Sequence, residues 1–287
     1  MKQIPNLRNS AFTLVELSIV LVIIALVIGG IVLGRDLIQG SAIRATISQL
    51  NQFNAAMNTF RLKYDAMPGD MGSAKAAQFA FSTRPTSSPY GCGYGNENGI
   101  INSWNITWAT SCNTSSGYVQ FGEPMMFWVD LSAANLIPYT FNTATMLANP
   151  ASIAETTTPG LRDYYPPAKL GGGNYFFAFS TMVSSGAGSG GVKMGNYLGL
   201  ANITQAVFWM GTTQLSMSIA QAYAIDSKVD DGLALSGGVL AKYVASNMLH
   251  DMGDGYTGCN QYGSSYATGM KTYGHDSVTC ALIFKFP

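Results

Sequence analysis

The chain of 287 residues is long enough for one large domain or two small ones, and it carries little charge. Only 10% of its residues are charged, against about 25% in an average soluble domain, and the formal net charge is zero. Together with abundant glycine, tyrosine and phenylalanine, this composition favours an exported, β-rich domain over a cytosolic enzyme. Because neither the net charge nor any basic run indicates a phosphate-binding surface, no nucleic-acid partner is expected.

The N-terminus combines a short basic leader with a long apolar segment. Residues 12–33 carry one charge, the carboxylate of Glu16, and as a helix they extend about 33 Å, close to the roughly 30 Å of bilayer hydrocarbon. An ordinary secretory signal has a shorter apolar core with a small residue after it, whereas here the small residue Ala11 comes first. This order predicts that cleavage removes residues 1–11 and keeps a membrane-spanning helix. A carboxylate inside such a span costs about 2.5–3.5 kcal/mol, so we expect Glu16 to have a role beyond anchoring.

The helix is predicted to continue beyond the membrane. Apolar residues recur at steps of three and four over residues 35–64 and define one stripe of an amphipathic helix. Gly29, Gly30 and Gly34 weaken the helix, each by roughly 1 kcal/mol relative to alanine. Pro68-Gly69-Asp70 is expected to end it. The stripe consists of Ile43, Ile47, Leu50, Phe53, Met57, Phe60 and Tyr64.

Residues 65–287 are predicted to form a separate domain that contains both helices and strands. Pro124 suits the first turn of a helix, and the aromatic, β-branched run near 174–183 is typical of a buried strand. Loops are expected at 82–117 and 185–191. The predicted helices are 123–136 and 214–225, and the predicted strands are 174–183, 194–201, 205–210, 238–245 and 278–286.

The four cysteines are expected to form disulfides. All of them lie after the apolar segment, and an even number in an exported chain favours pairing. Three pairings are possible, and the local spacing favours Cys92 with Cys112 and Cys259 with Cys280. The alternative is four buried thiols. Zinc is not expected, because the chain has no C-x-x-C motif and only two histidines, His250 and His275.

The segment Ala11-Phe12-Thr13-Leu14-Val15-Glu16-Leu17 resembles the cleavage and methylation motif of type IV pilin precursors and their relatives. The resemblance implies that a prepilin peptidase cuts between Ala11 and Phe12 and then methylates the new amino group of Phe12. It departs from the family in having alanine where glycine usually precedes the cut. In a helical filament, Glu16 of one subunit can neutralise the Phe12 amine of a neighbour, which offsets the cost of burying both charges. The alternative is that Glu16 only reaches the lipid headgroups.

Two further segments resemble the same family, and together the three span the chain. Residues 63–70 resemble the Tyr…Pro-Gly-Asp exit of the long helix, and residues 225–232 resemble a late Asp-rich turn. The resemblance implies an α+β, pilin-like fold in which the long helix 12–64 packs on an antiparallel sheet.

It also implies a non-enzymatic filament subunit, a pilin or minor pilin, whose partners are other pilin subunits, the prepilin peptidase, an inner-membrane assembly platform and the lipid bilayer. Such a subunit sits in the inner membrane before assembly and in a surface or periplasmic filament afterwards. The alternatives are a type II secretion pseudopilin and, from a different class, a membrane-anchored periplasmic binding protein or enzyme.

Three carboxylates near the late turn form a candidate calcium site. Asp226, Asp230 and Asp231 lie within six residues, and pseudopilins of type II secretion bind calcium in a C-terminal loop. The spacing does not match an EF-hand, and the alternative is a solvated turn in which the aspartates bond local backbone. Asp251 and Asp254 are weaker candidates.

Other motifs are expected to carry no chemistry. The glycines at 186, 188 and 191 match a dinucleotide fingerprint, but no helix and no acidic residue follow at the required spacing. No cofactor is predicted. The clustered aromatic residues are expected to form a core rather than a ligand groove. These residues are Trp104, Trp108, Phe121, Phe127, Trp128, Phe176, Phe177, Phe179, Phe208 and Trp209.

Overall fold

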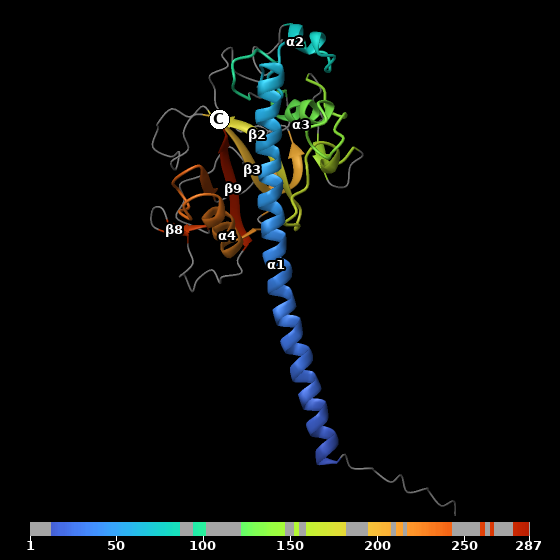
Figure 1. Cartoon of the computed structure of the whole chain (residues 1–287), viewed down its shortest axis with the longest axis vertical. Coiled ribbons are helices and arrows are strands. Elements are labelled where there is room, and N and C mark those ends of the chain that lie inside the picture. Colours follow the sequence, from blue (N-terminus) through green and yellow to red (C-terminus); the bar gives the residue numbers. More distant parts are fainter. Residues whose placement is uncertain are drawn as a thin grey trace, which may run out of the picture. The chain divides into compact units, whose positions relative to one another are not determined.

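The apolar segment and the amphipathic segment after it form one continuous helix, α1 (Leu14–Tyr64), shown in blue in the computed structural model of Figure 1. The helix passes through Gly29, Gly30 and Gly34 without a break. The model describes residues 13–86, 94–101, 122–146, 152–154, 159–181, 195–207, 211–214, 217–242, 259–261, 265–266 and 278–286. It divides into two compact units, Met1–Ala42 and Ile43–Pro287, so the second half of α1 belongs to the same unit as the sheet.

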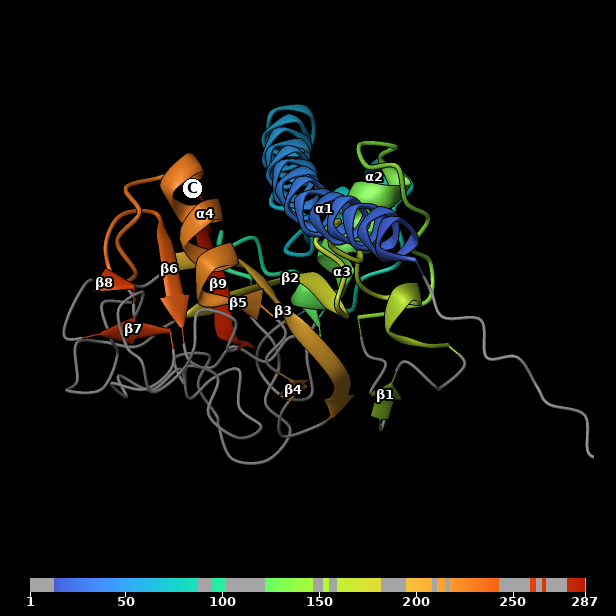
Figure 2. The same cartoon turned by 90° about the horizontal axis from the view of Figure 1, so that it is seen from below.

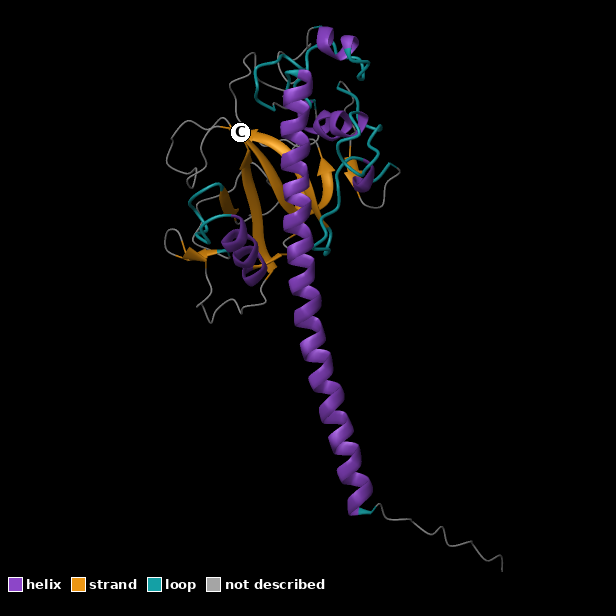
Figure 3. Ribbon diagram, viewed as in Figure 1, coloured by secondary structure: helices purple, strands orange, loops and turns teal. Residues whose placement is uncertain are grey.

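The second unit contains short helices around an antiparallel sheet (Figure 3). The helices after α1 are α2 (Ser73–Gln78), α3 (Glu123–Ala133), the 3-10 helix η1 (Leu161–Asp163) and α4 (Ile219–Val229). The strands are β1 (Ser152–Ala154), β2 (Asn174–Thr181), β3 (Gly195–Val207), β4 (Gly211–Gln214), β5 (Met217–Ser218), β6 (Val239–Lys242), β7 (Asn260–Gln261), β8 (Ser265–Tyr266) and β9 (Val278–Phe286).

Strand β3 organises the sheet. Along β3, residues 195–202 pair with β2 and residues 196–200 with β9, so these two strands lie on opposite sides of it. β1 and β4 pair with the later part of β3, β5 and β6 pair with β9, and β7 pairs only with β8. This arrangement confirms the predicted α+β, pilin-like fold with an antiparallel sheet.

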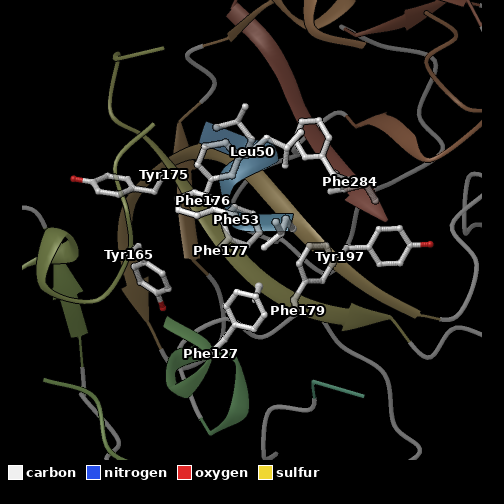
Figure 4. Close-up of a cluster of buried hydrophobic side chains, with 14 of the residues drawn as sticks. Leu50, Phe53, Phe127, Tyr165, Tyr175, Phe176, Phe177, Phe179, Tyr197 and Phe284 are labelled. Atoms are coloured by element: carbon white, nitrogen blue, oxygen red, sulfur yellow. The ribbon is translucent and has the colours of Figure 1, made fainter. Parts of the chain in front are cut away.

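The predicted stripe of α1 packs on this sheet. All seven of its residues are buried except Ile47, which is partly buried. Phe53 lies at the centre: its ring centroid is 5.0 Å from that of Trp128 on α3 and 5.2 Å from that of Phe176 on β2. Figure 2 shows α1 and α3 on the same face of the sheet, and Figure 4 shows the buried hydrophobic cluster, to which Phe53, Phe127 and Phe176 belong.

The aromatic residues predicted to form a core do so wherever the structure describes them. Phe127, Trp128, Phe176, Phe177 and Phe179 are at most 1% exposed. Trp104, Trp108, Phe121, Phe208 and Trp209 lie outside the described residues, as do the glycines at 186–191 and both histidines.

Three predicted boundaries were wrong for local reasons. The two strands predicted at 194–201 and 205–210 are one strand, β3, which continues through a bulge between Ile203 and Gln205. The helix predicted at 214–225 begins at Ile219, because the Ser218 side chain caps it by accepting from the Gln221 backbone N–H at 3.2 Å. The helix predicted at 123–136 ends at Ala133, and Asn135 follows with φ +56°.

Two polar contacts fix the packed half of α1. Gln49 is buried and bridges to another segment: its Nε2 donates to the Tyr139 hydroxyl and the Pro167 carbonyl, and its Oε1 accepts from the Lys169 N–H. At the end of α1, the Lys75 ammonium donates to the backbone carbonyl of Asp65. A cation is favourable here, because the last carbonyls of a helix lack partners and the helix dipole is negative at this end.

We expect Phe53→Ala to lower the free energy of unfolding by about 3–5 kcal/mol, because it removes a buried aromatic ring and leaves a cavity. Denaturant unfolding of the detergent-solubilised chain, followed by tryptophan fluorescence, measures this. Gln52→Ala, on the exposed side of α1, is the control and should change the value by less than about 0.5 kcal/mol. Equal effects of the two substitutions would contradict the packing described here.

Candidate functional site

Glu16, the only charged residue of the apolar segment 12–33, is hydrogen-bonded to Thr13 in the first turn of α1. The Glu16 carboxylate accepts from the Thr13 N–H and from the Thr13 hydroxyl, both on Oε2 at 2.8 Å. The Thr13 hydroxyl in turn accepts from the Glu16 N–H at 3.2 Å. This is a capping box, and the T-x-x-E spacing in the sequence was a signal for it that the sequence analysis missed. Ala11 and Phe12 lie outside the described residues.

The apolar half of α1 has no cover within the described part of the chain. Every described side chain from Leu14 to Leu33 is exposed, including large ones such as Leu14 at 87% and Leu26 at 72%. By length and composition this part of the helix can cross a membrane. Burial of the helix begins at Ile43. A run of exposed apolar side chains of this length requires lipid or protein around it.

Cys259 and Cys280 form a disulfide with an S–S distance of 2.05 Å, as their spacing predicted. Cys280 lies on β9, so the bond ties the segment before β7 to a central strand of the sheet. Cys92 and Cys112 lie outside the described residues.

The three candidate calcium ligands come together at the end of α4. One carboxylate oxygen from each of Asp226, Asp230 and Asp231 lies within 4.8 Å of the others. Two ligands of one calcium ion, each 2.3–2.6 Å from it, lie at most about 5 Å apart, so the spacing is compatible with a shared ion. Asp226 is buried, whereas the other two are exposed.

The same carboxylates also shape the turn between α4 and β6. Asp230 Oδ2 accepts from the backbone N–H groups of Gly238 and Val239, and Asp231 accepts from the Leu233 N–H and the Ser236 hydroxyl. These bonds lower the pKa of Asp231 below its usual value, the Ser236 bond having the largest effect. The Asp231 carboxylate is therefore ionised at neutral pH, and a ring of carboxylate oxygens suits both a turn and a hard cation.

A second polar centre, at the exit of α1, was not predicted from the sequence. The Asp70 carboxylate is 1% exposed and accepts three backbone N–H groups of the loop 94–101. The Pro-Gly-Asp motif was the available signal, but by itself it predicts only the end of the helix. Asp70 also lines an open groove of about 710 Å³ between the end of α1, Lys75 and this loop.

A buried ion pair lies beside this centre. Arg84 and Asp130 pair through Nη2 and Oδ1, and both side chains are fully buried. The other oxygen of Asp130 accepts the Gly69 N–H at 2.7 Å. Gly69 has φ +85°, and a Cβ at this position would lie 2.3 Å from the Glu123 carbonyl oxygen, so only glycine fits. No local pattern in the sequence indicates this pair, because its members are 46 residues apart.

Comparison with protein-family models matches residues 6–32 to the Prokaryotic N-terminal methylation motif. The chain thus carries the cleavage motif of type IV pilin and pseudopilin precursors. The motif implies a pilin-like or pseudopilin-like subunit that a prepilin peptidase processes. The matched range includes Ala11, Phe12, Thr13 and Glu16. No curated protein and no solved structure matches the chain.

We propose calcium as the ligand of the Asp226, Asp230 and Asp231 carboxylates. Calcium at about a hundred times its Kd should stabilise the folded chain by about 2.7 kcal/mol, seen as a rise in Tm of a few degrees. Asp230→Ala should lose this rise, whereas Asp163→Asn, a change at an exposed carboxylate elsewhere, should keep it. A wild-type Tm that does not change when calcium is added would contradict the proposal. These carboxylates would then serve only to shape the turn.

Asp130→Ala should destabilise the fold by about 3–5 kcal/mol, because it leaves the buried Arg84 charge without its carboxylate. The double variant Arg84→Met/Asp130→Leu removes both charges and should recover part of the loss. Denaturant unfolding compares the three chains. A double variant as unstable as Asp130→Ala would assign the loss to the Gly69 contact instead of the charge.

Proposed function

We propose that the chain is a structural, non-enzymatic subunit of a type IV pilus-like filament and that it assembles through the first half of α1. One observation carries the proposal: the methylation motif opens a helix whose apolar side chains are exposed from Leu14 to Leu33. Under this proposal the prepilin peptidase cuts between Ala11 and Phe12 and methylates Phe12. The mature subunit then begins one residue before the capping box of Thr13 and Glu16.

The same helix serves two environments in this proposal. Before assembly the lipid bilayer of the bacterial inner membrane covers its apolar side chains. After an assembly platform extracts the subunit, the helices of other pilin subunits cover them. Burial of apolar area stabilises both states, so transfer between them exchanges one apolar contact for another. The unit Ile43–Pro287, with its own core and disulfide, would face outward in a surface or periplasmic filament.

Glu16 supplies the polar contact within this apolar interface. Both Thr13 donors bond to Oε2, and an ionised carboxylate has two oxygens that accept several donors. We propose that Glu16 also accepts the amine of Phe12 from a neighbouring subunit. An ion pair in an apolar environment fixes register, because a misplaced subunit would leave both charges buried and unpaired.

A minor pilin and a type II secretion pseudopilin are the alternatives within this class. The mature chain of 276 residues, which is 287 without the leader of 11, is longer than many major pilins. Quantitative mass spectrometry of sheared filaments distinguishes them: a major pilin dominates the sample, a minor pilin is rare, and a pseudopilin is absent. A membrane-anchored binding protein or enzyme instead predicts full activity in a soluble fragment that starts near Asp36.

We expect Glu16→Ala to keep membrane insertion but reduce filament yield at least tenfold, because the Phe12 amine of each added subunit then lacks its partner. Ser18→Ala is the matched control: Ser18 is an exposed polar residue in the same span, and its hydroxyl donates to the local Val15 carbonyl. Membrane fractionation and electron microscopy of sheared filaments measure both quantities. Normal filaments from Glu16→Ala would refute the assigned role of Glu16.

Processing is tested on the same filaments. Mass spectrometry of the wild-type N-terminus should find N-methyl phenylalanine at Phe12 and no residue of the leader. An intact leader in the assembled protein would contradict processing by a prepilin peptidase.

A further inference from the structure

The buried Asp70 carboxylate at the exit of α1 accepts three backbone N–H groups of the loop 94–101. Asp70 Oδ1 accepts the N–H groups of Asn96 and Glu97 at 3.1 and 2.9 Å, and Oδ2 accepts that of Gly99 at 2.7 Å. Gly95, Glu97 and Gly99 all have positive φ, between +58° and +79°. Alternating positive φ turns successive N–H groups to one side, and the result is a backbone nest that binds an anion.

The loop is also tied to its surroundings at both ends. The Asn196 side chain on β3 donates to the Gly99 carbonyl at 2.7 Å and accepts the Ile101 N–H at 2.9 Å. The Glu123 carboxylate of α3 accepts the Gly95 N–H at 2.9 Å. Between these ties the Asp70 carboxylate is the centre of the nest, so a change in its charge acts on the N–H groups that it accepts while the Asn196 and Glu123 bonds remain.

The lysine and the buried arginine nearest this centre pair with other carboxylates. Lys75 on α2 pairs with Asp65 at the end of α1 and with Glu97 on the loop, at 3.3 and 3.4 Å. Arg84 pairs with Asp130 of α3. The remaining charged groups near this centre are Arg61 on α1, which lines the same groove, and Glu123. Asp70 itself accepts the backbone N–H groups of Asn96, Glu97 and Gly99.

We propose that Asp70 is an acid-sensitive clasp: its ionised carboxylate holds the loop 94–101 against the exit of α1, and protonation releases the Gly99 N–H. Oδ1 accepts two N–H groups and Oδ2 accepts one, so the proton is expected on Oδ2, where its O–H faces the Gly99 donor and weakens that bond. Asp70, Glu97 and Gly99 line the groove of about 710 Å³, so release of Gly99 reshapes one wall of it.

The acidity of Asp70 places this change near neutral pH. Burial raises the pKa of Asp70 to about 6, against the opposing effect of the backbone N–H groups, of which Gly99 is the strongest. Since this pKa lies above the usual value for aspartate, protonation stabilises the folded chain relative to the unfolded one. The contribution of Asp70 to stability is fully present below about pH 4 and is lost as the pH rises through about 6. Acid is therefore expected to loosen the loop while it stabilises the fold as a whole.

Hydrogen exchange of the full mature chain in detergent tests the clasp. The protection factor of the Gly99 amide should fall about tenfold between about pH 7 and about pH 5, with little change in the amides of β3. In Asp70→Asn, the amide nitrogen faces the Gly99 N–H, so protection should be low at both pH values. Asp163→Asn is the matched control: Asp163 also accepts a backbone N–H but is exposed, and its replacement should leave the Gly99 response intact.

Thermal unfolding provides a second measurement that tests the same proposal. The Tm of the wild type minus that of Asp70→Asn should increase from about pH 7.5 to about pH 5, in the opposite direction to the Gly99 protection. If Asp70→Asn does not fold, NMR titration of the Asp70 carboxyl carbon against the Gly99 amide in the wild type replaces it. Gly99 protection that is constant over this pH range, or that changes equally in Asp70→Asn, would overturn the clasp. Neither result bears on the filament assembly tested through Glu16.

Discussion

The structure depends on how the apolar surface of α1 is covered. From Ile43 to Tyr64 the sheet and α3 cover one stripe of the helix, with Phe53 between Trp128 and Phe176. From Leu14 to Leu33 the apolar side chains surround the helix and remain exposed. A stripe suits a partner on one side, whereas an apolar surface on all sides suits lipid or a bundle of helices. The chain thus carries two kinds of helix in one element, and the change between them coincides with the boundary of the compact unit at Ile43.

The spacing of apolar residues predicted both parts of α1, because this spacing is a local property of the sequence. All seven stripe residues could be chosen from steps of three and four, and the structure buries or partly buries each of them. The end of α1 was equally local, since Pro68 and Gly69 cannot continue a helix there. Boundaries that depend on side-chain bonds were less accurate. The start of α4 is set by the bond between Ser218 and Gln221, and a pattern of apolar residues does not contain that information.

The polar centre at the exit of α1 could not be predicted, because its partners are far apart in the sequence. Asp70 bonds residues 26 to 29 positions away, and Gly69 bonds Asp130 across 61 positions. Pairing of this kind follows from the fold rather than from spacing. The consequence is still specific, since each buried acceptor must be matched or the fold loses about 1–3 kcal/mol for each unpaired group. The Pro-Gly-Asp motif therefore connects the exit of α1 to helix α3 and to the loop 94–101, in addition to ending a helix.

Glu16 and Asp70 apply the same physical solution at the two ends of α1. Each is a carboxylate in a place that disfavours charge, and each accepts donors from the backbone near it: Glu16 from Thr13 and Asp70 from residues 96–99. The two carboxylates differ in how exposed they are. The Asp70 carboxylate is 1% exposed and its donors come from one loop, so a change in its charge acts on that loop and on the groove beside it. The Thr13 cap occupies one oxygen of an exposed carboxylate, so Glu16 can take a further donor from outside the chain. Exposure thus separates the carboxylate suited to assembly from the one suited to internal control.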